Sequence, residues 1–265
     1  MTITLLACQI ELPQITSVEA RNHYTAEMIQ RLDHCLISRP ADMVVFPELS
    51  STGYPMQGLE NISELAEDMA GVTVTAFAEL AQKHKTAICF GMPRRAGDSV
   101  MLSQVMVYGD GRAAGFYDKI YLHSGEKPAF SAGEKIFVTE LAGLRFGVII
   151  CYDMRFPELC RRLAFEGSVD VILHAVAMER DDTFRSWPSF VLTRALENEA
   201  YMLSVNYAGD DFGGSLFCPP RLDEGHDMCC LDTSEDFHYF TVDQTMIDSV
   251  RKHPSYRSVQ KEKDC

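Results

Sequence analysis

The feature that most constrains the fold of this chain is an uncharged run from Phe146 to Ile150, with the sequence Phe-Gly-Val-Ile-Ile. Its residues are β-branched, aromatic or glycine, which is typical of a strand that is covered on both faces. A strand of this kind needs a layer of structure on each side. We therefore expect a layered α/β fold.

The run ends at Cys151, after which the sequence at once becomes polar. Pro157 fits the first turn of a helix, from which Phe156, Leu159 and Leu163 can pack inward. Helix amides just beyond a cysteine stabilise a thiolate or an oxyanion. A lone cysteine at a strand end is more commonly an inert core residue. The placement nevertheless makes Cys151 a candidate nucleophile at a strand-to-helix turn.

Strand and helix patterns alternate along the chain. Apolar residues at helical spacing predict helices around Met28 and over residues 72–83 and 186–198. Apolar runs predict strands at residues 3–9, 42–46, 86–91, 169–174 and 201–206. Turn sequences predict two hairpins, which pair residues 103–108 with 112–119 and residues 136–141 with 144–150. Hairpins inside a βα alternation predict a four-layer αββα sandwich of two mixed β-sheets with outer helices.

Length and composition favour one compact unit. With 265 residues and 46% hydrophobic content, the chain is close to the upper size for one core, and no linker, repeat or low-complexity tract divides it. We expect a single domain over residues 1–265. The amino terminus has no basic region before its first strand pattern, and no apolar run is long enough to span a membrane.

Charge and cysteine usage narrow the classes of partner. The 24 basic and 38 acidic residues give a net charge of −14, which repels nucleic acid and favours small substrates. The nine cysteines have no CxxC spacing, which argues against a disulfide framework and against a structural zinc site. We expect a cytoplasmic protein that binds no metal, nucleic acid or membrane.

Two further strands end in charged residues. Glu48 follows the predicted strand at residues 42–46, and Lys119 ends the strand at residues 112–119. Taken alone, each would be interpreted as an exposed surface residue. Together with Cys151 they supply a base, a cation and a nucleophile, which are the three roles that acyl transfer to a thiol requires.

Three segments in this order resemble the carbon-nitrogen hydrolase, or nitrilase, superfamily over residues 6 to about 250. They are Pro47-Glu48, Tyr117-Asp118-Lys119 and Cys151-Tyr152-Asp153-Met154-Arg155-Phe156-Pro157-Glu158. Residues 194–198 also look like the family's helix before the strand that ends at Asn206. The resemblance implies an αββα sandwich. It also implies at least a dimer, formed through that helix and the helix after the cysteine.

The resemblance also implies roles for individual residues. Glu48 would be the general base, Lys119 the stabiliser of negative charge, and Cys151 the nucleophile that forms a thioester. Members have a second glutamate after the lysine, for which Glu126 is the best match and Glu134 the alternative. The scheme needs no metal or organic cofactor.

The residues after Cys151 look more like the amidase branches, including the ω-amidase-like enzymes, than the true nitrilases, which commonly carry Trp-Glu there. We therefore predict hydrolysis of a small amide to an acid and ammonia. The alternatives are an N-carbamoyl amine or amino acid, and a nitrile. The residues predicted to line the pocket are Tyr54, Tyr152, Met178 and Asn206.

Other interpretations stay open. Arg155 would bind a substrate carboxylate or form a salt bridge with Glu158 or with a partner subunit. A different scheme would use His123 or His174 as the base for the cysteine, and a non-enzymatic binding protein would use no base.

The carboxyl-terminal part carries less information. Residues 216–234 are interpreted as strand and loop, and the Cys229-Cys230 pair has no assigned role. The chain lacks the long tail that builds spiral assemblies in some nitrilases. We therefore expect a homodimer or a closed homo-oligomer.

Overall fold

The computed structural model describes residues 1–54, 59, 61–252 and 255–263, and in these residues two six-stranded β-sheets form the centre of the protein. In spatial order, the first sheet contains β12 (Asp236–Asp243), β1 (Thr2–Gln9), β2 (Met43–Val45), β3 (Ala87–Ala96), β4 (Ser99–Tyr108) and β5 (Gly115–Asp118). The second contains β11 (Cys229–Cys230), β10 (Leu216–Cys218), β9 (Tyr201–Val205), β8 (Val171–Ala175), β7 (Leu144–Ile150) and β6 (Val138–Leu141). Both sheets are mixed, because three central parallel strands in each are flanked by antiparallel ones.

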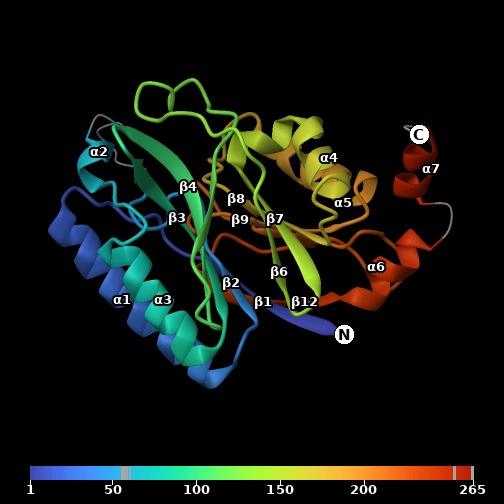
Figure 1. The fold of residues 1–265 in the computed structure, drawn as a ribbon, viewed down its shortest axis with the longest axis horizontal. Helices are drawn as coiled ribbons and strands as arrows, with labels where there is room; N and C mark the ends of the chain where they lie inside the picture. Colours follow the sequence, from blue (N-terminus) through green and yellow to red (C-terminus); the bar gives the residue numbers. More distant parts are fainter. Residues whose placement is uncertain (55–58, 60, 253–254, 264–265) are drawn as a thin grey trace.

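Helices cover the outer face of each sheet, as Figure 1 shows. The first sheet is covered by α1 (Val18–Ser38) and α3 (Val72–His84), and the second by α4 (Pro157–Phe165) and α5 (Trp187–Glu197). The remaining helices are α2 (Ile62–Leu65), α6 (Gln244–Arg251), α7 (Tyr256–Lys263) and the 3₁₀ turns η1 (Cys151–Arg155) and η2 (Phe184–Ser186). This arrangement confirms the predicted four-layer αββα sandwich.

The alternation of side chains explains why the central strands carry so few charges. In β7, Val148 and Ile150 pack into the core between the two sheets, whereas Ile149 packs against α4 and α5. In β1, Leu5 faces the core between the sheets and Leu6 faces α1 and α3. Each such side chain contributes about 1.5 to 3 kcal/mol when it is fully buried. Both faces of these strands are therefore apolar, as the run at residues 146–150 predicts.

Both predicted hairpins are present, as β4–β5 and β6–β7. A third hairpin, β3–β4, was not predicted because the predicted strand stopped at Gly91, before Pro93 and Arg94, residue types that commonly end a strand. In the structure β3 continues to Ala96, and Arg94 forms an ion pair with Asp118 at 2.6 Å. Beyond Ser234, where nothing was predicted, β12 pairs with β1 along its full length.

The loop of residues 46–52, which follows β2, is fastened to β3. The Phe46 amide donates to the Cys89 carbonyl at 2.8 Å, and the Ser51 amide donates to the Gly91 carbonyl at 2.9 Å. The Gly91 amide in turn donates to the Ser50 hydroxyl at 2.9 Å. A Cβ atom at Gly91 would lie 2.2 Å from the Leu49 backbone nitrogen, so a larger residue does not fit without a shift of this loop.

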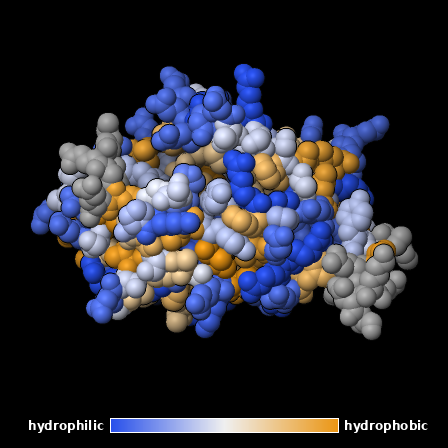
Figure 2. All heavy atoms as spheres, turned by 90° about the horizontal axis from the view of Figure 1, so that it is seen from above, coloured by the Kyte–Doolittle hydropathy of each residue, from blue (hydrophilic) through white to orange (hydrophobic). Residues whose placement is uncertain are grey.

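The surface mixes charged and apolar side chains. On the face shown in Figure 2, hydrophobic residues are interspersed among hydrophilic ones. The most exposed large apolar residues come from separate elements and include Ile37, Val72 and Tyr256. None of the described helices combines the length and the apolar character that crossing a bilayer requires.

Gly91→Ala is expected to lower the free energy of unfolding by about 1 to 3 kcal/mol, the usual cost of inserting a methyl group into a closely packed region. Urea denaturation measures this change. Gly225→Ala is the matched control, because the nearest atom to a Cβ there is 3.9 Å away and the residue is exposed. Equal stability of the two variants would contradict the close approach of β3 to residues 46–52.

Candidate active site

The ammonium group of Lys119 lies at the centre of a buried cluster of charges. Lys119 follows β5, and its amide extends the strand pairing by donating to the Leu102 carbonyl at 2.9 Å. Its Nζ atom donates to Glu48 Oε1 at 2.7 Å and to Glu126 Oε1 at 2.6 Å. The exposed fractions of Glu48, Lys119 and Glu126 are only 0%, 1% and 6%. An ammonium group that is removed from water needs such partners.

Glu48 is held from three directions. Besides the contact with Lys119, its Oε2 atom accepts the backbone amide of Ala177 at 3.1 Å. Its main-chain carbonyl accepts the hydroxyl of Tyr207 at 2.6 Å. The carboxylate is thereby fixed between the loop of residues 46–52 and the loop that follows β8.

Glu126 occupies the position predicted for the second glutamate. Its Oε1 atom also accepts the Tyr54 hydroxyl at 3.0 Å, and its Oε2 atom accepts the His123 amide at 2.8 Å. Glu134, the alternative at the sequence level, is exposed. Of these two candidates for the second glutamate, Glu126 is the one that contacts Lys119.

Cys151 follows β7 directly and is the first residue of η1. Its φ angle is +40°, a left-handed value that a residue with a Cβ atom adopts only at an energetic cost. Burial raises the pKa of its thiol, and the negative charge of Glu48 raises it further, while Lys119 and the Ala177 amide lower it. The thiol therefore lies within electrostatic reach of the buried charges and is protonated at neutral pH.

The same environment acts on the charged groups. Burial raises the pKa of Glu48, against the effect of Lys119, and the charge of Glu126 raises it further. Burial disfavours the charged form of Lys119, but the negative charges of Glu48, Cys151 and Glu126 together raise its pKa. The cluster thus contains a permanent cation and a carboxylate with an increased affinity for a proton.

A buried carboxylate, Asp153, closes the turn that carries Cys151. It accepts the amides of Ile150 at 3.0 Å and Tyr121 at 2.8 Å and the Tyr117 hydroxyl at 2.7 Å. Burial raises its pKa to about 6, although these hydrogen bonds lower it. Sequence analysis assigned it no role. The signal was present, because a carboxylate three residues past the last residue of a strand is well placed to accept the exposed amides of a turn.

Two predicted pocket residues contact each other rather than the charged cluster. The side chain of Asn206 accepts the Met178 amide and donates to the Met178 carbonyl, both at 2.9 Å, and it also donates to the Gly213 carbonyl. Its amide group is thus occupied in holding the loop after β8, which includes Ala177. The side chain of Met178 packs against the core beneath α5.

The side chain of Tyr152 lies against a different set of residues. Its ring is edge-on to Phe156 and to His123, each with a centroid distance of 5.5 Å. It lines a hollow of about 520 Å³ together with Ile120, Tyr121, Leu122, Lys127, Phe130, Ala132 and Phe156. Glu48, Lys119 and Cys151 do not line this hollow.

The remaining candidates have other environments. The guanidinium of Arg155 lies over the ring of Phe190 at 4.9 Å, and none of the ion pairs among the described residues joins it to Glu158. His123 is exposed. His174 is fully buried, and its Nε2 atom lies 3.1 Å from the Cys151 carbonyl oxygen. Within the described ranges, no group of three or more His, Cys, Asp or Glu residues is arranged to hold a metal ion.

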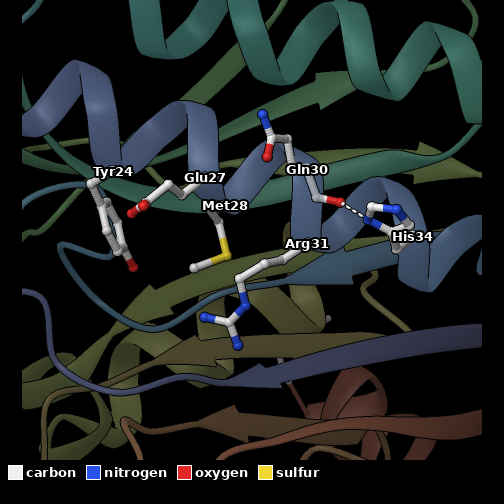
Figure 3. A pocket seen from close by; sticks show the side chains of 6 residues that line it. All are labelled: Tyr24, Glu27, Met28, Gln30, Arg31 and His34. Atoms are coloured by element: carbon white, nitrogen blue, oxygen red, sulfur yellow. Dashed lines mark hydrogen bonds between the residues drawn. The ribbon is translucent and has the colours of Figure 1, made fainter.

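A second hollow, shown in Figure 3, lies on the surface of α1. Its lining residues are Tyr24, Glu27, Met28, Gln30, Arg31 and His34. The ring of His34 contacts the Gln30 carbonyl at 2.9 Å. All six residues belong to one helix on the outer face of the first sheet. This hollow therefore receives no residue from the cluster around Lys119.

The chain is similar in sequence to several known hydrolases. It is 34% identical to a hydrolase of Pseudomonas protegens over 69% of this chain, and this alignment spans 65% of that protein, slightly less than two thirds of its length. It is 34% identical to a nitrilase of Pyrococcus abyssi, over 69% of this chain and 70% of that protein. It is 31% identical to a 2-oxoglutaramate amidase of Bacillus subtilis, over 69% of this chain and 72% of that protein.

Solved structures share the fold. The chain superposes on Nit3 of Saccharomyces cerevisiae, a member of branch 10 of the nitrilase superfamily, with a TM-score of 0.81 and 21% sequence identity. This superposition covers 96% of this chain and 94% of that one. The sequence profile named carbon-nitrogen hydrolase matches residues 6–250, which include all of the described strands except the first residues of β1. The chain therefore belongs to the carbon-nitrogen hydrolase family.

Proposed function

We propose that this protein is a cysteine-dependent amidase, which hydrolyses a small amide to an acid and ammonia through a thioester on Cys151. The observation that carries the proposal is the buried Glu48–Lys119–Glu126 cluster within electrostatic reach of a protonated thiol. Membership of the carbon-nitrogen hydrolase family and similarity to a 2-oxoglutaramate amidase support it.

The first step in this mechanism is activation of the thiol. Cys151 transfers its proton to Glu48, whose pKa is raised by burial. The total charge of the cluster does not change, because the carboxylate becomes neutral as the thiolate forms. This matters because Glu48 and Lys119 are buried, and separating charge is costly away from water.

The sulfur then attacks the carbonyl carbon of the amide, and the carbonyl electrons move to the oxygen. Lys119 and the backbone amide of Tyr152 stabilise the negative charge on that oxygen. Glu48 returns its proton to the nitrogen, the C–N bond breaks, and ammonia leaves a thioester on Cys151.

Hydrolysis of the thioester completes the reaction. Glu48 accepts a proton from water, and the resulting hydroxide attacks the thioester carbon. The sulfur leaves and takes back the proton from Glu48, which restores the Cys151 thiol and the Glu48 carboxylate, and the acid is released. Glu126 orients the amide or the water through its carboxylate, and no step uses a metal or an organic cofactor.

A substrate panel distinguishes this function from its alternatives. An N-carbamoyl substrate would use the same nucleophile, base and cation. Nitriles must also be tested, because the chain is similar to a nitrilase. Ammonia release is measured with primary amides, N-carbamoyl amino acids and nitriles, and mass spectrometry locates the acyl adduct. Failure of every compound to release ammonia would favour a protein that only binds.

The proposal extends to the oligomeric state and the cellular compartment of the protein. We expect one catalytic domain per chain and a cytoplasmic homodimer or closed homo-oligomer that associates through α4 and α5. The described cysteines are all free, which suits a reducing compartment. Light scattering on the purified protein measures its mass directly.

Cys151→Ala is expected to lower kcat for amide hydrolysis by about 10⁴-fold or more, because no thioester can form. Cys229→Ser is the matched control, since this cysteine is exposed on β11 and lies outside the proposed site. The control should retain wild-type activity. Substantial turnover by Cys151→Ala would exclude Cys151 as the nucleophile.

Lys119→Ala is expected to lower kcat by about 10² to 10³-fold, the effect of losing one donor to the developing oxyanion. It should also lower the free energy of unfolding by about 3 to 5 kcal/mol, because two buried carboxylates lose their cation. Lys127→Ala is the control, since this neighbouring lysine is exposed. A change confined to KM would contradict the assigned role.

A further inference from the structure

His174 connects the core of the second sheet to the backbone of Cys151. It lies in β8, opposite Ile149 of the neighbouring strand β7. Its Nε2 atom is 3.1 Å from the Cys151 carbonyl oxygen, and its Nδ1 atom is 2.7 Å from the hydroxyl oxygen of Ser204 in β9. That hydroxyl also accepts Nε1–H of Trp187 in α5 at 3.2 Å. His174, Ser204 and Trp187 are fully buried.

The chemistry of these groups sets the direction of each hydrogen bond. A carbonyl oxygen only accepts, so Nε2 of His174 carries a proton and donates to Cys151. Burial lowers the pKa of His174 to about 3, so the ring is neutral and its Nδ1 atom accepts the Ser204 hydroxyl proton. Trp187 donates to Ser204. The chain of donors therefore runs from α5 through β9 and β8 to the backbone of Cys151.

The carbonyl of Cys151 and the amide of Tyr152 belong to the same peptide unit. In a trans peptide these two groups point in opposite directions, so a group that fixes the carbonyl also fixes the direction of the amide. The left-handed conformation of Cys151 is energetically unfavourable for a residue with a Cβ atom, and it persists only where its surroundings impose it. A hydrogen bond to this carbonyl is one such constraint.

We propose that His174 is a positioning residue, which holds the 151–152 peptide so that the Tyr152 amide points at the oxygen of the reacting carbonyl. The inference rests on the proposed function, in which that amide is an oxyanion donor. His174 does not act as the base, because both of its ring nitrogens are engaged with groups other than the thiol. Its effect on the reaction passes through the backbone of Cys151.

Three variants at this position separate positioning from packing. His174→Phe fills the space of the ring but donates no hydrogen bond. The amide of His174→Gln can reach the place of Nε2 and donate to Cys151, whereas the shorter amide of His174→Asn reaches only the place of Nδ1. The Gln and Asn variants are both polar and differ mainly in this reach, so they carry the test if the Phe variant does not fold.

We expect His174→Phe and His174→Asn to lower kcat for amide hydrolysis by about 10- to 100-fold, with KM changed by less than about twofold, the scale on which supporting groups affect a site. His174→Gln should restore kcat to within about fivefold of wild type, by the same reasoning. Alkylation of Cys151 by iodoacetamide, followed by peptide mass spectrometry, should change by less than about twofold in every variant. That reaction displaces iodide at a saturated carbon and creates no oxyanion to stabilise.

Crystal structures of the wild type and of the Phe and Asn variants provide a readout that does not depend on turnover. We expect the 151–152 peptide to rotate when the donor is lost. An unmoved peptide, equal kcat in the Gln and Asn variants, or a parallel loss of alkylation and turnover would overturn the inference. A wild-type protein that releases no ammonia would refute the proposed function instead, and the peptide orientation would still decide the role of His174.

Discussion

The rest of the site depends on one interaction, the pairing of the buried Lys119 ammonium with the carboxylates of Glu48 and Glu126. Taking these charges out of water costs several kcal/mol for each ion, and good geometry on every side must offset that cost. The three residues come from three separate segments, the loop after β2, the end of β5 and the loop before β6. Displacement of any one of them leaves a buried charge without its partner. The ion cluster therefore couples the positions of these three segments. The packing of the segments in turn keeps the charged groups at hydrogen-bond distance.

The two-sheet architecture supplies the fourth member of the site. Glu48 and Lys119 follow strands of the first sheet, whereas Cys151 follows β7 of the second. Val45 is the last residue of β2 and Ile150 is the last residue of β7, and both pack in the core between the sheets. This core therefore sets the distance between the two strand ends. The backbone amide of Ala177 then links the sheets at the site itself. It donates a hydrogen bond to the Glu48 carboxylate, and it lowers the pKa of the Cys151 thiol. A site shared between two sheets is sensitive to their relative position, which close packing of the core restricts.

The sequence predicted what depends on local patterns. The central strands, both expected hairpins and the charged residues at strand ends follow from periodicity and turn chemistry. Two of those charged residues, Glu48 and Lys119, lie in hydrogen-bond contact in the fold. The continuation of β3 through Pro93 and Arg94 was missed because its stabilising partner, Asp118, lies 24 residues away. No local pattern indicates that Tyr207 holds the backbone of Glu48 or that Asn206 holds the loop of Met178. These contacts exist only once the sheets have packed.

The geometry at Cys151 illustrates how a strained residue is kept in place by its neighbours. A left-handed cysteine at a strand end would relax if its flanking peptides were free to rotate. On one side, Asp153 accepts the Ile150 amide, and on the other, His174 contacts the Cys151 carbonyl. The Ile150 amide belongs to the 149–150 peptide, whereas the Cys151 carbonyl belongs to the 151–152 peptide. Asp153 therefore fixes the end of the strand before the nucleophile, and His174 fixes the peptide that follows it. Because His174 is neutral, it contacts the carbonyl without adding a second cation near Lys119. A protonated His174 would be repelled by the Lys119 ammonium. On the carbonyl side of Cys151, the backbone is therefore constrained without a change in the charge of the site.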